Sequence, residues 1–273
     1  MHNRLRETVG LLVLVLMSLA TLIPFVVMFV TALHPAGSSP AGFAWPDEPH
    51  WENFGRAFVD SDFVVLAGSS ATIVLGVVPA ALLFATLGGF ALGHVRVPGS
   101  TPIFLVFLLG LTIPFEAAIV PLYYQAQDLG TLNTPWAVIL PLIGWLMPFG
   151  IFWMRGQFAA IPAELAEAAH LDGASSVQVL RYVHLPLLTP ALVTLGLLQF
   201  LTAWNNFLLS IVLIDDPSRR TMAGALAAFQ GEHSVDVPLM CAAAVLLMAP
   251  TLLVFLLLQR HFVKAVLAGA VKG

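Results

Sequence analysis

Six long apolar stretches constrain this chain more than any other feature of its sequence. They cover residues 9–33, 64–93, 102–122, 135–153, 187–214 and 238–262. A helix needs about 20 mostly apolar residues to cross a bilayer, and each stretch is close to that length or longer. Because the stretches are continuous and not alternating, they favour helices over the strands of a membrane barrel. The sequence therefore predicts an all-α, polytopic membrane protein with six transmembrane helices.

The composition agrees with a lipid environment. Hydrophobic residues make up 59% of the chain and charged residues 10%, whereas soluble domains carry about 25% charged residues. Acidic residues outnumber basic ones by 15 to 11, which argues against a nucleic-acid partner. The single cysteine, Cys241, excludes a CxxC metal or redox site. Membrane lipid is thus the expected surroundings of most of the surface.

The first stretch has two interpretations, because Arg4 and Arg6 precede it as they would precede the core of a secretory signal. The apolar run from Val9 to Leu33 is longer than the roughly 7–15 residues of a signal core. We therefore expect the first stretch to be retained as a membrane span.

The basic residues predict the direction of insertion, since Lys and Arg accumulate on the cytoplasmic side. With the N-terminus inside, the outer segments hold only Arg56, Arg219 and Arg220. The cytoplasmic segments then hold the other basic residues, namely Arg4, Arg6, Arg96, Arg155, Arg181, Arg260, Lys264 and Lys272. Both termini and the loop 154–186 are accordingly predicted to be cytoplasmic.

The loop 154–186 reads as two helices joined by a turn. We expect a first helix from Pro162 to Leu171, a turn at Asp172 and Gly173, and a second helix capped by Ser175 or Ser176 that ends at Val183. Leu185 and Pro186 would then mark the beginning of the fifth span.

The first of these helices carries a small-residue apolar surface beside two acids. The apolar residues are Leu165, Ala168, Ala169 and Leu171, and the acids are Glu164 and Glu167. Such a helix lies either on the membrane surface or against another protein. Helices that lie on lipid usually present Lys or Arg, so the acids favour a protein partner.

Several segments resemble the permease subunits of binding-protein-dependent ABC importers. "EAAHLDGA" at 167–174, followed by "LP" at 185–186, resembles the EAA loop of that family. "IPAELAEAAHLDGAS", "LPLLTPAL", "WNNFLLSIVLI", "ENF" at 52–54 and the C-terminal "GAVKG" resemble its maltose-type, MalG-like carbohydrate branch. The resemblance implies a type I importer permease fold in the inner membrane of a bacterium, formed by one permease domain over residues 1–273.

This resemblance implies a set of partners and the residues that meet them. The expected partners are a homologous second permease, two ATP-binding subunits and an extracytoplasmic sugar-binding protein. ATP and Mg would be bound by the ATPase subunits, because this chain has no GxxxxGK[ST] loop and no cofactor of its own is expected. By resemblance, the ATPase contact is made by Glu167, Ala168, Ala169, Asp172 and Gly173, and by Gly269, Lys272 and Gly273 of the tail.

A second group of candidates consists of polar and aromatic residues in or near the spans. They are Glu116, Gln199, Trp204, Asn205 and Asn206. Polar side chains in lipid normally face the bundle interior or a water-filled path. They could serve as interhelical contacts or line a sugar path with Trp204 as a stacking face. In the maltose-type importers the sugar contacts are attributed mainly to the partner permease.

The outer segment 215–237 also has two interpretations. "AGALAAFQGEHS" would form one short helix that ends at Gly231. In maltose-type permeases the corresponding loop enters the cleft of the binding protein, which by resemblance places Phe229, Gln230 and Gly231 at or near its tip. The alternative is a passive connector.

Other classes of protein fit less well. An ion-gradient-driven secondary transporter would need a charged or broken-helix ion site, usually within related repeats, and Glu116 is the one carboxylate well inside a span. A membrane enzyme would need a nucleophile with its base or a metal site, and the scattered histidines have no HxxxH or HExxH spacing. The residues do not identify the sugar.

Overall fold

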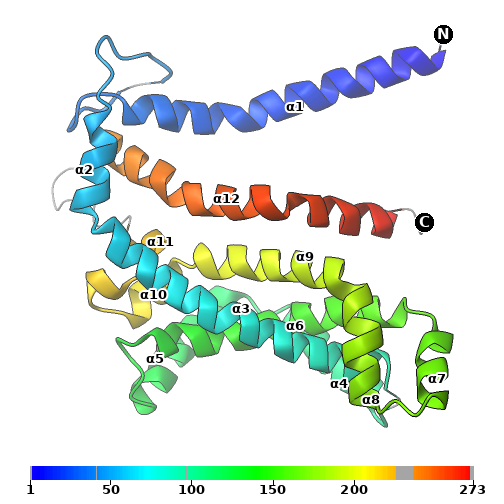
Figure 1. Ribbon diagram of the computed structural model, residues 1–273. Helices are drawn as coiled ribbons and strands as arrows, with labels where there is room; N and C mark the ends of the chain where they lie inside the picture. Colours follow the sequence, from blue (N-terminus) through cyan, green and yellow to red (C-terminus); the bar gives the residue numbers. More distant parts are fainter. Residues whose placement is uncertain (1, 41, 96, 226–235, 271–273) are drawn as a thin grey trace. The chain divides into compact units, whose positions relative to one another are not determined.

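The structure of the chain is a computed structural model that describes residues 2–40, 42–95, 97–225 and 236–270. Within these residues the regular elements are helices, and no strand occurs (Figure 1). The chain divides into two compact units. One comprises residues 1–63 and 226–249, and the other comprises residues 64–225 and 250–273. The all-α class is thereby confirmed, and the single permease domain stays a prediction.

The first unit is built from α1 (His2–Ala32), α2 (Glu52–Asp60) and the first part of α12 (Val237–Ala270). Small side chains make its core, because Ala32, Ala57, Ala242 and Ala243 pack together. The Thr8–Ala32 part of α1 has a mean hydropathy of 2.7, and its apolar side chains are mostly exposed. Lipid is the environment that such a surface requires.

Asn53 gives the "ENF" segment a structural role in this unit. Its side-chain amide donates to the Ala32 carbonyl at 2.9 Å and to the His34 carbonyl at 2.8 Å. Carbonyls at the end of a helix have no intrahelical donor, so buried Asn53 satisfies the end of α1. Asp236 acts at the start of α12, where its carboxylate accepts from the Leu239 amide and also from the Gly37 amide of the loop after α1.

The second unit contains the remaining helices and most of the candidate residues. Their order is α3 (Phe63–Gly93), α4 (Ser100–Gly110), η1 (Phe115–Ala118), α5 (Ile119–Asp128), α6 (Pro135–Ala159), α7 (Ala163–Leu171), α8 (Ser176–Gln178), η2 (Val179–His184), α9 (Leu185–Trp204), α10 (Leu208–Leu213), η3 (Pro217–Arg219) and α11 (Met222–Ala225). Residue 63 belongs to the first unit, and α12 from Pro250 onward belongs to the second.

Glycines allow α3, α6 and α9 to pack closely. A Cβ added at Gly89 would lie 2.5 Å from the Cβ of Met154, and one added at Gly93 would lie 2.8 Å from the Arg155 carbonyl oxygen. On α6, a Cβ at Gly150 would lie 2.8 Å from the Cβ of Ala85. Small residues at such spacing let membrane helices approach each other without loss of van der Waals contact. These three helices form the scaffold for the sites described below.

The third predicted span, 102–122, is wrong as a continuous helix. Among the residues that the structure describes, five helices are long and apolar enough to cross a membrane, and α4 with the segment Phe115–Asp128 forms a sixth candidate that is bent by 93°. The break lies between Gly110 and Phe115. Pro114 is extended there, with φ −70° and ψ 132°, and proline also disfavours helical backbone in the residue before it. This region therefore turns sharply where a straight span was expected.

The boundaries of the fifth predicted span, 187–214, are also wrong. The helix runs without a break from Ser176 to Trp204, and residues 205–207 then separate it from α10. A π-helical segment, Val179–His184, lies just before Pro186. Proline removes one helical N–H, and π turns are rare and occur mostly as single-turn bulges inside α-helices. The loop's second helix and the span are thus one element.

Candidate functional site

The segment between α6 and α9 brings together the five residues expected to contact an ATPase (Figure 1). Helix α7 begins at Ala163 after Pro162 and ends at Leu171, one residue from the predicted start and at the predicted end. Beyond it the Gly173 amide donates to the His170 carbonyl at 3.0 Å, and the Ala174 amide donates to the Ala169 carbonyl at 3.0 Å. These two bonds form a Schellman motif, which reverses the chain direction firmly.

Gly173 meets the conformational requirement of this turn. Its φ is +87°, and a Cβ added there would meet no atom within 4 Å. A side chain would therefore fit in space but would strain the backbone, since left-handed conformations are accessible mainly to glycine. The predicted turn at Asp172 and Gly173 is confirmed.

The helix that follows begins with a capping box. The Ser175 hydroxyl accepts from the Gln178 amide at 3.4 Å, and the Gln178 side chain accepts from the Ser175 amide at 2.7 Å. Two unpaired amides of the first turn are satisfied in this way. Of the two serines predicted as caps, Ser175 is the one used.

The outer face of this segment, which we call the α7 surface, is exposed and mainly apolar with two acids. It comprises Leu165, Glu167, Ala168, Leu171, Asp172, Gly173 and Val177. Leu171 is 90% exposed and Val177 is 73% exposed. Ala166 is buried toward the helices below, and Ala169 is half-buried between the two sides. Exposed apolar groups beside carboxylates suit a protein contact. The sequence did not predict that Val177 belongs to this surface or that Ala166 is buried.

Three histidines, His94, His170 and His184, lie within this segment or next to it. The rings of His94 and His184 are 4.3 Å apart, and Phe90 packs against both. A cavity of about 160 Å³ is lined by His94 and His170 together with Phe90, Val95, Ser176 and Val179. Desolvation by burial, followed by the charge of His170, lowers the pKa of His94 below 6.5. Among the described residues no group of three or more His, Cys, Asp or Glu side chains could hold a metal ion.

The candidate path residues separate into two environments. Gln199, Trp204 and Asn206 are buried in the second unit. The Gln199 amide nitrogen and oxygen, the Trp204 ring nitrogen and the Asn206 side-chain oxygen make no hydrogen bond in the structure. Glu116 lies in η1 at the bend, and Asn205 follows the end of α9; both are exposed.

Two cavities in the second unit lie along the bent region. The larger, about 560 Å³, lies among α4, η1, α5 and α6, and its lining includes Trp136, Gln125 and Trp145. The other, about 390 Å³, lies among α4, α6 and α9 and is lined in part by Trp145, Gln199 and Thr202. Both are lined by Gly110 and Trp145. Gln199 is therefore the one path candidate that borders either of these two cavities.

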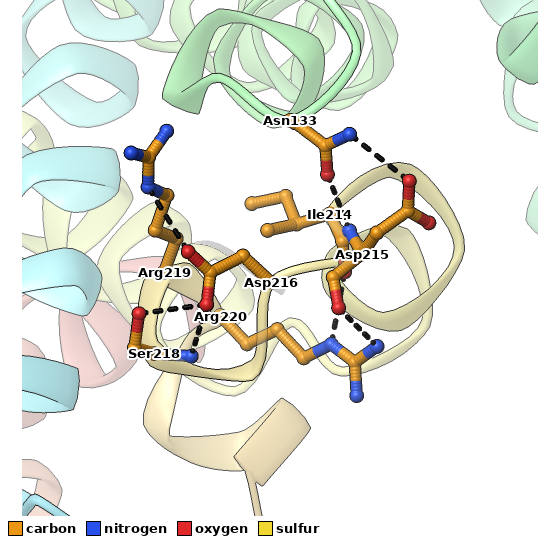
Figure 2. Close-up of polar contacts among 7 residues, drawn as sticks. All are labelled: Asn133, Ile214, Asp215, Asp216, Ser218, Arg219 and Arg220. Atoms are coloured by element: carbon orange, nitrogen blue, oxygen red, sulfur yellow. Dashed lines mark hydrogen bonds and ion pairs between the residues drawn. The ribbon is translucent and has the colours of Figure 1, made fainter.

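The first residues of the predicted outer segment 215–237 have a defined conformation (Figure 2). The Asn133 side chain donates to the Asp215 carboxylate at 2.9 Å and accepts from the Asp215 amide at 2.5 Å. Arg220 donates to the carbonyls of Ile214 and Asp215. Asp216 pairs with Arg219 at 3.3 Å, and hydrogen bonds from Ser218 lower the pKa of Asp216 below its usual value.

Buried hydroxyls hold the chain beyond this base. Thr221 donates its amide to the Ser210 hydroxyl at 2.8 Å, and the Met222 amide donates to the Ser70 hydroxyl at 2.9 Å. Helix α11 begins there. Phe229, Gln230 and Gly231 lie outside the described residues, as do Lys272 and Gly273, whereas Gly269 lies in the last turn of α12.

Comparison with known proteins identifies the family. Residues 72–268 match the family described as "Binding-protein-dependent transport system inner membrane component". The diacetylchitobiose uptake permease DasC of Streptomyces coelicolor is 32% identical, with 95% of each chain covered. Its relative NgcG from the same organism is 30% identical over 94% of this chain and 86% of its own length. The melibiose, raffinose and stachyose import permease MelC of Bacillus subtilis is 29% identical over 93% and 92%.

A solved structure has the same fold. A chain of a bacterial ABC transporter involved in the import of the acidic polysaccharide alginate matches 95% of this chain and 97% of its own length. The TM-score is 0.79 at 24% sequence identity. The family match, the similarity over nearly the whole length and the six candidate spans agree with one another. The chain therefore belongs to the inner-membrane components of binding-protein-dependent transport systems, the multi-pass permease subunits of bacterial ABC importers.

Proposed function

We propose that this chain is the permease subunit of an ATP-driven carbohydrate importer. It would form half of the translocation path together with a homologous second permease. The relatives named for the uptake of diacetylchitobiose and of melibiose, raffinose and stachyose support a carbohydrate as the transported substrate. In this proposal both termini and the segment between α6 and α9 are cytoplasmic, and an extracytoplasmic sugar-binding protein delivers the substrate on the other side.

The α7 surface is the observation that carries the proposed coupling. Leu171 and Val177 are apolar and largely exposed, and the acids Glu167 and Asp172 of the same surface are exposed too. The hydrogen bonds of the Schellman turn and the capping box fix the backbone that carries these side chains. Apolar groups surrounded by charge form a surface that another protein can cover. We assign it to an ATP-binding subunit that carries the ATP and Mg.

Conformational coupling follows from this contact. When two ATP-binding subunits close on ATP, the docked α7 surfaces would move toward each other and the permease helices would open outward. Hydrolysis would reverse the motion. In this scheme the chain changes conformation, and the partner subunits carry out the covalent chemistry.

Two further contacts belong to the same proposal. We assign the tip Phe229, Gln230 and Gly231 to the binding protein, on the support of a base anchored by Asn133 and Asp215. We assign Gly269, Lys272 and Gly273 of the C-terminal tail to the ATP-binding subunits. A cysteine at Gln230 should crosslink to the binding protein in the nucleotide-bound state, and removal of residues 269–273 should lower hydrolysis more than assembly.

The decisive experiment uses the complex purified through a tag on this chain. Its ATPase activity should rise when the binding protein and its sugar are added. Uptake by vesicles that depends on an ion gradient and not on ATP would contradict the proposal and support a secondary transporter.

The subunit contact has a matched crosslinking test. A cysteine at Leu171 should crosslink to the ATP-binding subunit. A cysteine at Leu187, which is 53% exposed on α9, should not, because it lies ten residues beyond Val177 along the same helix, about 15 Å from the α7 surface. Equal crosslinking at the two positions would contradict the assigned surface.

A further inference from the structure

We propose that α2 lies flat in the membrane–water interface at the Ala32 end of α1 and binds the lipid surface there. The side chains that meet the lipid form one group, which we call the aromatic row: Trp51, Phe54 and Phe58. The partner is the headgroup and glycerol region of the leaflet, which the proposed orientation makes the outer leaflet. This inference concerns attachment to lipid, and it does not depend on the substrate that the chain carries.

The direction of α2 gives the first step of the argument. Figure 1 shows α2 lying across the end of α1 within the first unit. The candidate span Thr8–Ala32 runs through the bilayer, so a helix that lies across its end runs along the bilayer surface. Asn53 joins the two helices, because its amide donates to the Ala32 and His34 carbonyls. Attachment of α2 to lipid would therefore hold this end of α1 at a fixed depth.

The faces of α2 give the second step. Asn53 and Ala57 are buried against the rest of the unit. The charged residues recur every four positions and are all exposed; they are Glu52, Arg56 and Asp60. Trp51 has helical backbone, with φ −63° and ψ −25°. At about 100° per residue, the aromatic row falls within an arc of about 60° on the side opposite to the charges.

The aromatic row continues the lipid-facing surface of α1, which is the third step. Phe29 of α1 is 37% exposed. Its ring lies 6.0 Å from that of Trp51 and 5.8 Å from that of Phe54. Trp51 and Phe58 remain 58% and 41% exposed. Because the exposed apolar surface of α1 requires lipid, the aromatic surface continuous with it meets the same lipid.

The composition of this part of the chain suits an interface. Six of the 21 residues from 43 to 63 are aromatic, whereas aromatic residues make up 10% of the whole chain. Tryptophan concentrates at membrane–water interfaces, because its ring has an apolar body and a polar edge. The α7 surface, assigned to a protein partner, has no aromatic side chain.

The charges of α2 predict how it binds. Its charged face has two acids and one base, whereas helices attracted to anionic lipid present Lys and Arg. The aromatic row, and not charge, would therefore supply the attachment. Binding should be the same with and without anionic lipid.

Nitroxide labels on two faces of α2 test the proposal in the whole complex, reconstituted in phosphatidylcholine vesicles. Cys241→Ala removes the chain's own thiol, and that complex without a new cysteine is the blank. Phe58→Cys places a label on the aromatic row, and Arg56→Cys is the matched control on the charged face. The ratio of collisions with oxygen, which concentrates in lipid, to collisions with a water-soluble nickel complex should be severalfold higher at position 58. Added phosphatidylglycerol should leave the ratio unchanged.

A second measurement keeps a ring in place, because Phe58→Cys also removes the stacking of Phe58 on Phe63. Trp51→Phe retains a ring against Phe29, and the fluorescence that the parent complex has beyond this variant belongs to Trp51. Lipids brominated near the headgroup end of their chains should quench that difference more than lipids brominated near the methyl end.

Three results would overturn the inference. The first is an equal collision ratio at positions 56 and 58, together with Trp51 fluorescence that neither lipid quenches. The second is protection of position 58 from both reagents, which would assign the aromatic row to a contact with the second permease. The third is immobilisation of that label when the binding protein and its sugar are added, which would assign the row to the binding protein. The proposed import function stands in each case, because stimulation of ATPase activity tests it separately.

Discussion

Asn133 and Asp215 hold each other by a reciprocal pair of hydrogen bonds, although 82 residues separate them in sequence. Asn133 follows α5 with φ +60°, and Asp215 follows α10 (Figure 2). This pair connects the bent region around the cavities to the base of the outer segment. A movement of either segment would therefore be transmitted to the other through these hydrogen bonds.

Replacement of Asn133 by glycine should loosen that base. Glycine tolerates the positive φ, so Asn133→Gly removes the two hydrogen bonds without adding strain. Hydrogen exchange at the Asp215 amide should become roughly tenfold faster, about the effect of one lost hydrogen bond. Asn133→Ala should have a larger effect, because it adds backbone strain. Unchanged exchange in both variants would show that the pair does not hold the segment.

Reversal of the charge at Glu167 should uncouple transport. Glu167 is exposed on the α7 surface, and in the proposed complex it would pair with a basic group of the ATP-binding subunit, which a lysine would repel. We expect uptake to fall at least tenfold while the chain remains in the membrane. Glu164→Lys, at the first turn of the same helix, is the control and should lower uptake less. The comparison requires equal amounts of both variants in isolated membranes.

Two substitutions at Gly173 separate the effect of the left-handed backbone from the effect of an added charge. Asp and Asn have similar size, and both visit this region more readily than other residues, but aspartate adds a charge beside Asp172. Gly173→Asp should therefore abolish ATP-coupled uptake, and Gly173→Asn should retain part of it. If the two variants are equally active, the added charge does not matter for coupling, and if both match the parent chain the glycine at this turn does not matter either.

The packing beneath α7 should depend on pH. Burial and the charge of His170 lower the pKa of His94 below 6.5, so the unfolded loop binds a proton more readily than the folded one. Stability is then complete above about pH 6.5 and declines as the pH falls from that value toward the lowered pKa. His184 also faces His94 through their ring contact, and a second positive charge there would add to the loss.

This pH dependence can be measured by hydrogen exchange. In the purified complex, amides of residues 163–178 should exchange faster at pH 5.5 than at pH 7.5, after correction for intrinsic rates. His94→Phe keeps a ring against Phe90 and removes the titrating group, so it should reduce the difference. An equal difference in this variant would assign the effect to other groups.

The local signals of the sequence predicted local structure well. The turn at Gly173 and the cap at Ser175 depend on neighbouring residues, and both are confirmed. The general succession of apolar helices is also confirmed, because a run of lipid-facing residues needs no knowledge of its partners. The family assigned from "EAAHLDGA" and the other matched segments is confirmed by the match over residues 72–268.

The features missed by the sequence depend on contacts between distant segments. Pro79 leaves α3 unbroken, whereas Pro114 lies at the break before η1. The difference lies in the neighbouring backbone and packing, and proline alone does not decide it. The cavity beside Gln199 arises only when α4, α6 and α9 come together. The proximity of His94 to His184 could not be read from their spacing of ninety residues for the same reason.

The uninterrupted helix from Ser176 to Trp204 fixes the rotation of the residues near its end, such as Gln199, relative to the α7 surface at its start. It has 29 residues and thus a length of about 40 Å at 1.5 Å per residue. One residue added or removed within Val179–His184 would rotate everything beyond it by about 100° relative to the α7 surface. Gln199 would then turn away from its cavity without any change in its own neighbours in sequence. The π-helical turn therefore sets the rotational register between the two ends.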